Sequence, residues 1–400
     1  MSNCRVVLGS KEERPRESDE QGQAAGEHGV IKRLYVHNFR CMENFELELG
    51  GASSSLLIGP NGSGKSSVGL VLELLQSIAR GEARLGRLLS PKDFTRGRRD
   101  VPMRFELEAV VAGTSFHYAL ALELPPRFKE LRVLEERLTA GGEDLFSRDQ
   151  AEVSLARGGG ATARFLVDWH LAALPVIQEP ASDDPLAVFR SWLARMLVLA
   201  PVPSRISGES AGDVEFLARD CANLAGALSH LLRTHPAAYA RVERYLRTVM
   251  PELLDVTNPP VGGDARRLTL RFAAAEDPAS ALAPAFEDLS DGEKCFVVCA
   301  VVLAKAEVEG PLFTFWDEPD AHLAPSEVQH FVRALRRSAR GGSQLLVSSH
   351  HGETMRAFSD ETTFLLHRRS RLEPAGVRRL DEIGARGDLV ASITRGDLVP

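Results

Sequence analysis

One glycine-rich segment has the residue types that surround phosphate groups. Residues 59–66 read Gly-Pro-Asn-Gly-Ser-Gly-Lys-Ser, which satisfies the pattern G-x-x-x-x-G-K-[ST]. Gly62 and Gly64 lack a Cβ, so backbone N–H groups can approach phosphate oxygens there. Lys65 would bridge the β- and γ-phosphates, and Ser66 would offer its hydroxyl to Mg²⁺. We expect the nucleotide to be lined by Gly59, Asn61, Gly62, Ser63, Gly64, Lys65, Ser66 and Ser67.

Two acidic residues follow an apolar run farther along the chain. Residues 312–316 are Leu-Phe-Thr-Phe-Trp, typical of a buried parallel strand, and Asp317 and Glu318 come directly after them. The carboxyl end of such a strand faces the crevice in which open α/β sheets bind ligands. An acidic pair by itself is more often a solvated turn. In a chain with a phosphate loop, the pair predicts a metal-shell carboxylate at Asp317 and a general base at Glu318.

Histidines follow a second apolar strand, predicted at 344–348. There His350 could hydrogen-bond the γ-phosphate or the attacking water, and we interpret it as functional. The sequence does not decide whether His351 shares that role. We interpret His322 and His330 as structural.

The start of a third element also has the residues of an anion site. Ser290 and Gly292 precede a helix predicted to begin near Glu293. A serine and a glycine at a helix N-terminus can hold a phosphate. The alternative is ordinary helix capping by Ser290 or Asp291.

The elements that would position these residues alternate between strands and helices at both ends of the chain. Periodicity predicts strands at 30–36, 45–49, 54–58, 103–111, 116–124, 131–138, 267–272, 311–316 and 344–348. It predicts helices at 66–79, 185–199, 214–234, 237–249, 293–307 and 326–340. We therefore expect an α/β protein with an antiparallel meander and an inserted helical subdomain. The expected parts are a disordered tail (1–29), an N-terminal lobe (30–165), a helical insert (166–265) and a C-terminal lobe (266–400).

Composition excludes several classes of protein. The 400 residues carry a net charge of -7, so the chain is not a general polycation for coating nucleic acid. Two arginine clusters remain candidate DNA contacts or solvated surface: Arg96, Arg98 and Arg99, and Arg233, Arg241, Arg244 and Arg247. Five scattered cysteines indicate neither a disulfide framework nor a zinc site, which favours the cytoplasm. No apolar run approaches the length of a membrane span, so we expect no membrane insertion.

The order of these motifs resembles that of the ABC-type ATPases. A phosphate loop is followed by a long insert, then by Leu-Ser-Asp-Gly-Glu-Lys (289–294), Asp-Glu-Pro-Asp (317–320) and Ser-Ser-His (348–350). Within that group it is similar to the RecF/SMC-like branch of AAA-family ATPases, whose opening strand and Asn-Phe-Arg are matched at 33–40. Residues 223–228 are also similar to a segment of the compact members.

The resemblance implies an ABC-type ATPase head with ATP and Mg²⁺ as cofactors. It implies that Glu318 is the catalytic glutamate, that His350 is the switch histidine, and that Arg40 lies near the nucleotide. Ser290 and Gly292 would contact the γ-phosphate bound to the other subunit, so a homodimer would form on ATP binding. Asp320 would fall in a segment that contacts that subunit.

Two departures from the family pattern bear on the function. Asp291 and Glu293 stand where transporter ATPases commonly carry glycine and glutamine, which favours the RecF/SMC-like branch. No convincing glutamine links the nucleotide to the insert, since Gln76 lies within the helix after the phosphate loop. We expect ATP hydrolysis to drive a conformational switch coupled to DNA or to a separate effector, in DNA repair or phage defence. The alternatives are the energy subunit of a membrane transporter and a nucleotide-gated scaffold with negligible turnover.

Overall fold

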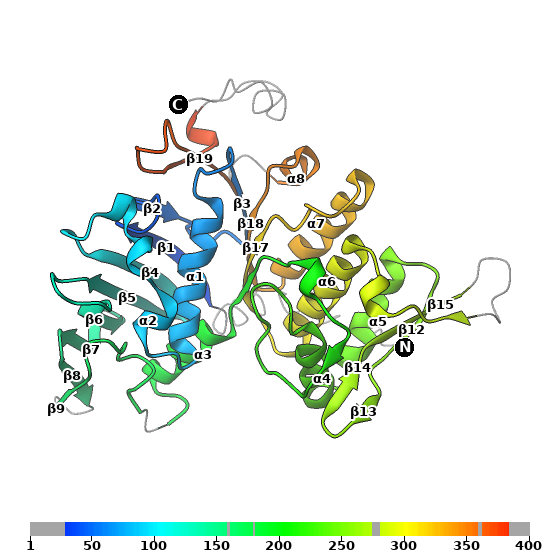
Figure 1. Ribbon diagram of the computed structural model, residues 1–400, viewed down its shortest axis with the longest axis horizontal. Helices are drawn as coiled ribbons and strands as arrows, with labels where there is room; N and C mark the ends of the chain where they lie inside the picture. The colour runs from blue at the N-terminus through cyan, green and yellow to red at the C-terminus, as the bar shows by residue number, and fades with distance from the viewer. Residues whose placement is uncertain (1–28, 158–160, 179–180, 274–280, 359–361, 384–400) are drawn as a thin grey trace, which may run out of the picture.

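Four layers build the part of the chain that the computed structural model describes, which comprises residues 29–157, 161–178, 181–273, 281–358 and 362–383. An antiparallel sheet, a layer of helices, a mostly parallel sheet and a second set of helices follow one another across the molecule (Figure 1). Residues 1–28 of the predicted tail lie outside the described residues.

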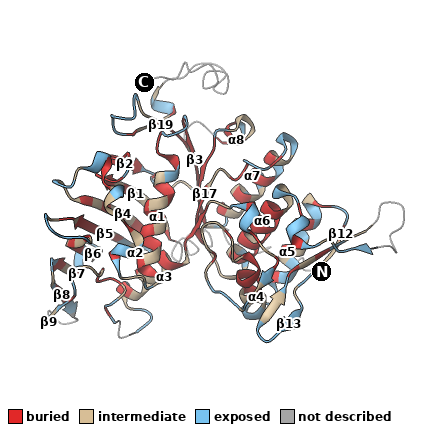
Figure 2. Ribbon diagram, in the orientation of Figure 1, coloured by how far each residue is buried: buried red, intermediate tan, exposed pale blue. Residues whose placement is uncertain are grey.

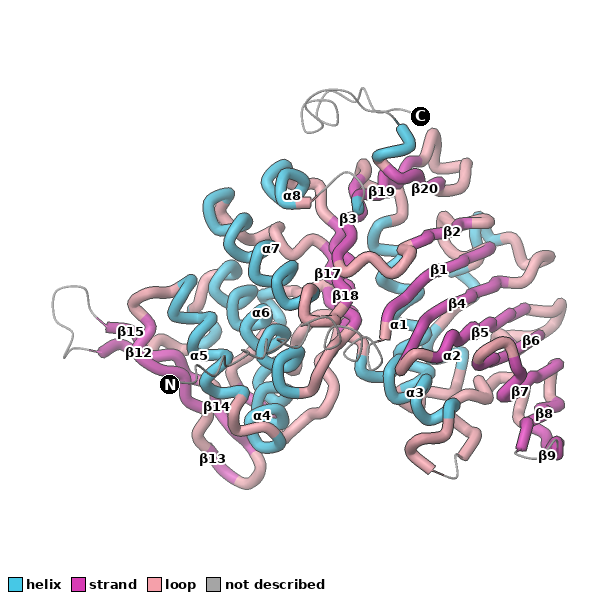
Figure 3. The backbone as a smooth tube through the Cα atoms, turned by 180° about the vertical axis from the view of Figure 1, so that it is seen from behind, coloured by secondary structure: helices cyan, strands magenta, loops and turns pink. Residues whose placement is uncertain are grey.

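Among the described residues the antiparallel sheet has eight strands, and its order can be followed in Figure 3. In pairing order they are β2 (Phe45–Glu48), β1 (Val30–His37), β4 (Met103–Val111), β5 (Thr114–Glu123), β6 (Arg132–Ala140), β7 (Glu143–Asp149), β8 (Glu152–Arg157) and β9 (Ala161–Leu166). Burial alternates along β4 because its odd-numbered residues enter the core and its even-numbered residues face the other side. The predicted meander is confirmed, and three strands that the sequence did not predict extend it from β6 to β9.

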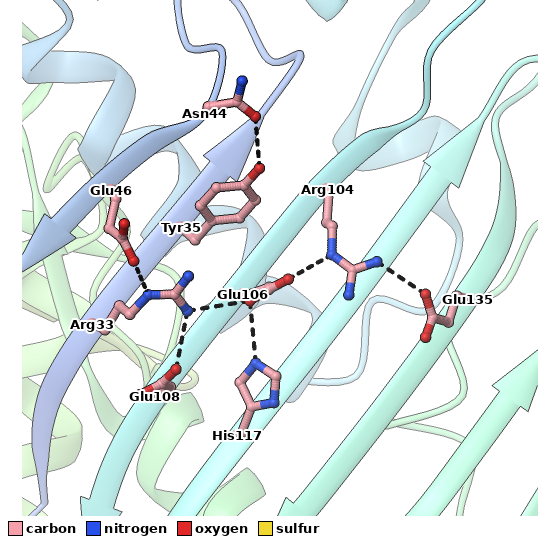
Figure 4. A network of polar contacts seen from close by, with 9 residues as sticks. All are labelled: Arg33, Tyr35, Asn44, Glu46, Arg104, Glu106, Glu108, His117 and Glu135. Carbon is pink, nitrogen blue, oxygen red and sulfur yellow. Dashed lines mark hydrogen bonds and ion pairs between the residues drawn. The ribbon is translucent and has the colours of Figure 1, made fainter. Parts of the chain in front are cut away.

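The outer face of this sheet carries a network of charged side chains centred on Glu106 (Figure 4). The Glu106 carboxylate contacts Arg33 at 3.2 Å, Arg104 at 2.5 Å and His117 at 3.4 Å. Arg33 also contacts Glu46 and Glu108, and Arg104 also contacts Glu135. We call these seven residues the Glu106 network; its members come from β1, β2, β4, β5 and β6.

The second large sheet has six strands in the part of the chain that the structure describes, and it is parallel except at one edge. In pairing order they are β10 (Leu197–Leu199), β17 (Phe313–Asp317), β18 (Gln344–Ser348), β3 (Ser54–Ile58), β19 (Thr363–His367) and β20 (Gly376–Arg379). Only β20 runs antiparallel to its neighbour. Strands β3, β17 and β18 are almost wholly buried, so they occupy the middle of the molecule (Figure 2).

Successive residues of the parallel strands belong to two different hydrophobic cores. Leu57 and Phe315 point into the core shared with the antiparallel sheet, with α1 (Lys65–Ala79) and with α3 (Pro185–Arg195). Leu56 and Trp316 point into the other core, which contains most of the remaining helices. Helix α1 approaches β17 closely at Gly69, where an added Cβ would lie 2.4 Å from the Phe315 ring.

The helices of the second core are α4 (Leu224–Thr234), α5 (Ala238–Val249), α6 (Asp291–Val308), α7 (Pro325–Ala339) and α8 (Gly352–Ala357). Helix α6 is buried along most of its length and packs against α4, α5 and α7. Two small antiparallel sheets lie beside them: β11 (Glu209–Ser210), β14 (Ala265–Arg267) and β13 (Pro260–Gly262); and β12 (Leu253–Thr257), β15 (Thr269–Ala273) and β16 (Ala281–Leu282). The described residues also form the short helix α2 (Leu85–Leu88) and 3₁₀ turns at Pro91–Asp93, Thr95–Gly97, Pro203–Arg205, Phe286–Asp288 and Asp381–Ile383.

The predicted helices at 185–199 and 214–234 are partly wrong. Helix α3 ends at Arg195, and residues 197–199 form β10, a strand parallel to β17. Residues 214–223 are not helical, because the Asn223 side chain accepts a hydrogen bond from Ala218 N at 2.8 Å and donates one to Phe216 O at 2.9 Å. Such side-chain bonds compete with the helical backbone, so α4 begins only at Leu224.

Candidate functional site

Three motif-bearing segments meet at one edge of the parallel sheet. Ser348, at the end of β18, pairs with Asp317 on β17 and with Leu57 on β3. The phosphate loop leaves β3 just beyond Leu57, and His350 follows β18 two residues after Ser348. The sheet register therefore brings the predicted phosphate loop, acidic pair and histidine to the position where α/β sheets bind ligands.

The phosphate loop has a backbone that glycine allows and other residues resist. Gly59, Gly62 and Gly64 have φ angles of 147°, 80° and 112°. A Cβ at Gly59 would lie 2.2 Å from Leu366 O, whereas Gly62 has open space. Gly64 begins α1 without a side-chain cap, so the first N–H groups of that helix remain available to an anion. The loop can therefore hold phosphate oxygens on backbone N–H groups.

Lys65 projects from the start of α1 back into the loop. Its ammonium donates hydrogen bonds to Gly59 O at 2.8 Å and to Pro60 O at 3.4 Å. Burial lowers the pKa of Lys65, while Glu318 and Asp317 favour its charged form and offset part of that effect. A cation is thus held in the centre of the loop by weak partners that phosphate oxygens could replace.

Neighbouring residues of the loop differ in exposure. Ser66 and Asn61 are exposed, Ser63 is buried, and Ser67 lies 3.7 Å from the Cys41 sulfur. Cys41, which follows the Asn-Phe-Arg turn at 38–40, thus contacts α1, the helix after the phosphate loop. A pocket of about 570 Å³ lies beside the loop, lined by residues 60–63 and by Arg368, Ser370 and Arg371.

Arg40 lies on the same turn, in a left-handed backbone conformation with a φ of 53°. Its guanidinium pairs with Asp93 at 2.9 Å, and 46% of its side chain is exposed. Arg40 therefore precedes Cys41, which contacts Ser67 on α1, and its own charge is paired with Asp93.

The acidic pair and the histidine are joined across β17 and β18. Ser348 donates a hydrogen bond to Asp317 Oδ1 and accepts one from Glu318 N at 3.1 Å. Glu318 has a φ of 49°, and its carboxylate lies 3.2 Å from His350 Nδ1. The left-handed conformation turns the chain sharply after Asp317. Two carboxylates with different surroundings therefore follow one another at the sheet edge.

Asp320 is held within its own chain, and the expected contact of its segment with a second subunit stays a prediction. Its side chain is 2% exposed and accepts hydrogen bonds from Ser349 and Thr354. It holds the turn after β17 against the start of α8.

Ser290 caps α6 in a reciprocal arrangement with Glu293. The Glu293 amide donates to Ser290 Oγ at 3.3 Å, and the Glu293 carboxylate accepts from Ser290 N at 2.7 Å. Ser290 is therefore a helix cap, as the alternative interpretation predicted, and it is also exposed at the surface. Gly292 sits where a Cβ would lie 3.0 Å from His322 O. Within the described ranges, no hydrogen bond or ion pair joins Ser290 to the phosphate loop of the same chain.

Sequence reasoning did not identify Arg219, which lies beside the acidic pair, or the pocket-lining residues Arg368, Ser370 and Arg371. Arg219 lies in the loop before α4 and contacts Asp317 Oδ2 at 3.6 Å. It belongs to no motif and was predicted within a helix, so only the observed loop conformation brings it to Asp317.

The oxygen ligands that Mg²⁺ prefers are present at the sheet edge. The Ser66 hydroxyl and the Asp317 carboxylate fit the usual pattern, in which one or two side chains and the substrate phosphates share the ion. No group of three or more His, Cys, Asp or Glu side chains in the described part of the chain could hold a metal alone.

Comparison with known families matches most of the chain. A family model described as "AAA domain, putative AbiEii toxin, Type IV TA system" covers residues 54–356. This range includes the phosphate loop, Ser290, Asp317, Glu318 and His350.

Two curated proteins are similar to parts of the chain. The zinc import ATP-binding protein ZnuC of Vibrio cholerae serotype O1 is 32% identical over 145 residues, or 36% of this chain and 50% of ZnuC. The OLD nuclease of Thermus scotoductus is 37% identical over 65 residues, or 16% of this chain and 12% of the nuclease. The chain thus matches half or less of the length of these relatives.

A solved structure of an SMC head bound to the C-winged helix domain of ScpA has a similar fold. Its TM-score is 0.51 at 15% identity, over 88% of this chain and 98% of that chain. At this identity the likeness concerns the fold alone, and it confirms the expected ABC-type head with a mixed sheet and an antiparallel meander. No helix among the described residues has the length and apolar character to cross a membrane.

Proposed function

The chain belongs to this AAA-domain family of P-loop ATPases, and from that premise we propose that it binds and hydrolyses ATP with Mg²⁺. The observation that carries the proposal is the shared sheet edge, where the phosphate loop lies beside Asp317, Glu318 and His350. These residues are the parts that phosphoryl transfer to water requires: an anion cradle, a metal-shell carboxylate and a base.

Each side chain has a role that its contacts support. The amides at 59–64 and the Lys65 ammonium bind the phosphates, and Ser66 and Asp317 hold Mg²⁺, which when bound neutralises phosphate charge. Glu318 orients and deprotonates the attacking water, because it follows Asp317 and its carboxylate is partly exposed. His350, 3.2 Å from that carboxylate, orients Glu318 and contacts the γ-phosphate. Arg40 is proposed to lie near the nucleotide, because the next residue, Cys41, contacts Ser67 on α1.

We further propose that ATP closes a homodimer. Ser290 is the exposed N-cap of α6, with Gly292 in the first turn, and Ser290 makes no described hydrogen bond with the phosphate loop of its own chain. A second copy could place this helix start against the γ-phosphate, where its N–H groups would favour the anion. Hydrolysis would remove that bridge and release the dimer.

The output of the switch is proposed to be a separate effector protein, with DNA as the alternative. Members of both arginine clusters are already paired: Arg96 and Arg98 with Glu43, Arg233 with Asp213, Arg241 with Glu307, and Arg247 with Glu243. These pairs reduce the positive charge that phosphates of DNA would meet. Phage defence and DNA repair remain the proposed settings, with the cytoplasm as the proposed location.

The substitution Glu318→Gln tests both the chemistry and the dimer. We expect phosphate release to fall by about 10²–10⁴-fold while ATP binding is kept, because the base is lost and the loop is not. Light scattering should then show a dimer in ATP and a monomer without it. Glu243→Gln, which alters a surface pair on α5, should change neither measurement.

Other outcomes would replace the proposal. Negligible phosphate release by the unaltered chain, with ATP bound, would indicate a nucleotide-gated scaffold. A monomer of Glu318→Gln in saturating ATP would contradict the dimer. The similarity to ZnuC keeps one further alternative, the energy subunit of a transporter, which co-purification with a membrane permease would support.

A further inference from the structure

A single arginine lies between two carboxylates at the edge of the candidate ATP site. Arg219 Nη2 is 3.6 Å from Asp317 Oδ2, and Arg219 Nε is 3.7 Å from Glu73 Oε2 on α1. The Nε atom is buried and has no hydrogen-bond partner among the described residues. Asp317 uses its other oxygen, Oδ1, to accept the hydrogen bond from Ser348. The guanidinium thus lies on the side of Asp317 that this bond leaves open.

The loop that carries Arg219 is tied to elements on both sides. Arg219 O accepts a hydrogen bond from Ala200 N at 2.8 Å, and Asp220 O accepts one from Val202 N at 3.1 Å, just after β10. At its other end, the Asn223 side chain is hydrogen-bonded to Ala218 N and Phe216 O of the same loop, and α4 begins at the next residue. A shift of the arginine would therefore involve both the segment after β10 and the start of α4.

We propose that Arg219 is the positioning residue that couples the nucleotide site to the α4 region. Without nucleotide, its charge balances Asp317. Mg²⁺ brought by ATP would compete for the same carboxylate, and two cations cannot share it closely without repulsion. Binding of Mg·ATP would thus release Arg219 and loosen residues 216–221. This coupling supplies the link that the missing glutamine left open, and it rests on the proposed Mg·ATP site.

Linkage fixes the sign of the effect. If Mg·ATP displaces Arg219, then removing Arg219 must tighten Mg·ATP binding. Binding of ATP without Mg²⁺ should not change, because the competition is for the metal position. An arginine that instead stabilised the phosphates directly would have the opposite effect, and its loss would weaken binding with and without Mg²⁺.

The first experiment measures the affinity of the full chain for a fluorescent ATP analogue in Mg²⁺ and in EDTA. We expect Arg219→Gln and Arg219→Ala to bind about fivefold or more tightly in Mg²⁺ and unchanged in EDTA. Arg219→Lys, which keeps the charge, should remain close to the unaltered chain. Arg205→Ala is the matched control, because Arg205 pairs with Asp220 of the same loop at 2.7 Å and not with Asp317. Unchanged or weaker binding of Arg219→Gln in Mg²⁺ would overturn the proposal.

Hydrogen exchange gives a readout that does not depend on affinity. In the unaltered chain, Mg·ATP should speed exchange of the Ala200 and Val202 amides, which donate to residues 219 and 220. In Arg219→Gln these amides should exchange fast already and should not respond to Mg·ATP. A response that persists in the variant would place the coupling elsewhere. If the unaltered chain fails to bind nucleotide at all, the proposed function fails; if it binds and the variants match it, only this coupling does.

Discussion

The Glu106 network and the candidate ATP site are both built from charged side chains, but they are arranged in opposite ways. Glu106 is surrounded by Arg33, Arg104 and His117, and both arginines contact further carboxylates (Figure 4). At the candidate ATP site, the hydrogen bonds described for the Lys65 ammonium go to two backbone carbonyl oxygens, and the one described for the Glu318 carboxylate involves His350. The first cluster is saturated with internal partners, and the second keeps capacity for a ligand.

The pKa shifts follow the same division. Burial would raise the pKa of Glu106, but hydrogen bonds from Arg104 and Arg33 outweigh it and lower that pKa below its ordinary value of 4.5. At Lys65, burial lowers the pKa, and Glu318 and Asp317 offset this only in part. The surroundings of Glu106 stabilise its charged form, whereas the surroundings of Lys65 destabilise its charged form. Substitutions should therefore affect stability in one cluster and activity in the other.

The largest expected effect comes from Lys65→Ala. Loss of the loop cation should lower kcat/KM for ATP by about 10²–10³-fold, as for removal of one preorganised charge donor. Stability should hold or rise, since a buried cation with weak partners is lost. Lys32→Ala is a matched control, because Lys32 also donates to a glycine carbonyl, Gly50 O at 3.3 Å, far from the motifs. Near-normal turnover of Lys65→Ala would show that the two clusters do not differ as described.

Ser290→Arg adds a charge at the exposed start of α6, and so tests whether this position must stay open for a second subunit. A long cation at the exposed start of α6 should block approach of a second copy and lower turnover by about a hundredfold, comparable to loss of one phosphate contact. Binding of ATP to the single subunit should be unchanged, as equilibrium titration would reveal. Retained turnover would reduce Ser290 to the helix cap that its bond with Glu293 forms.

A smaller loss is expected for His350→Ala. Glu318 would lose the partner 3.2 Å away and would be less well oriented, so kcat should fall by about 10–10²-fold with little change in ATP affinity. The neighbouring variant His351→Ala tests the residue whose role the sequence did not decide. An equal loss in both variants would assign the effect to the local backbone rather than to His350.

The smallest effect on activity is expected for Glu106→Gln, which should leave turnover unchanged. Its cost is in stability, about 1.5–3 kcal/mol for loss of hydrogen bonds to charged partners, measured by denaturant unfolding at pH 7. A carboxylate whose pKa is lower in the folded state stabilises the fold when the pH is above its pKa in the unfolded state. That contribution is lost as the pH falls through the folded-state pKa. The difference in stability between the two proteins should therefore shrink below about pH 4.5. A difference that stays constant with pH would contradict the role of the carboxylate charge.

The sequence predicted those parts of the site that local backbone chemistry controls. The phosphate loop requires glycines at fixed positions, and the apolar runs before Asp317 and Ser348 identify buried strands. The roles assigned to Ser290, Glu318 and His350 stay predictions until they are tested. Strand periods also located β1, β2, β4, β5 and β6 of the antiparallel sheet and β3, β17 and β18 of the parallel sheet.

What the sequence did not predict depends on contacts between distant segments. The strand β10 is three residues long and gains its hydrogen bonds from β17, so no local pattern distinguishes it from the end of α3. The loop at 214–223 has apolar spacing that suits a helix, yet side-chain bonds from Asn223 stop it. Arg219 reaches Asp317 only because of that loop, which is why it could not be identified from its residue type.

The alternating burial of β3 has a mechanical consequence. Leu57 packs in one core, and Leu56 and Ile58 pack in the other. The strand that leads into the phosphate loop therefore belongs to both cores. Close packing on both faces opposes displacement of the strand, because each face would have to repack. We therefore expect the end of β3 that leads into the phosphate loop to move less on nucleotide binding than the helices around α6.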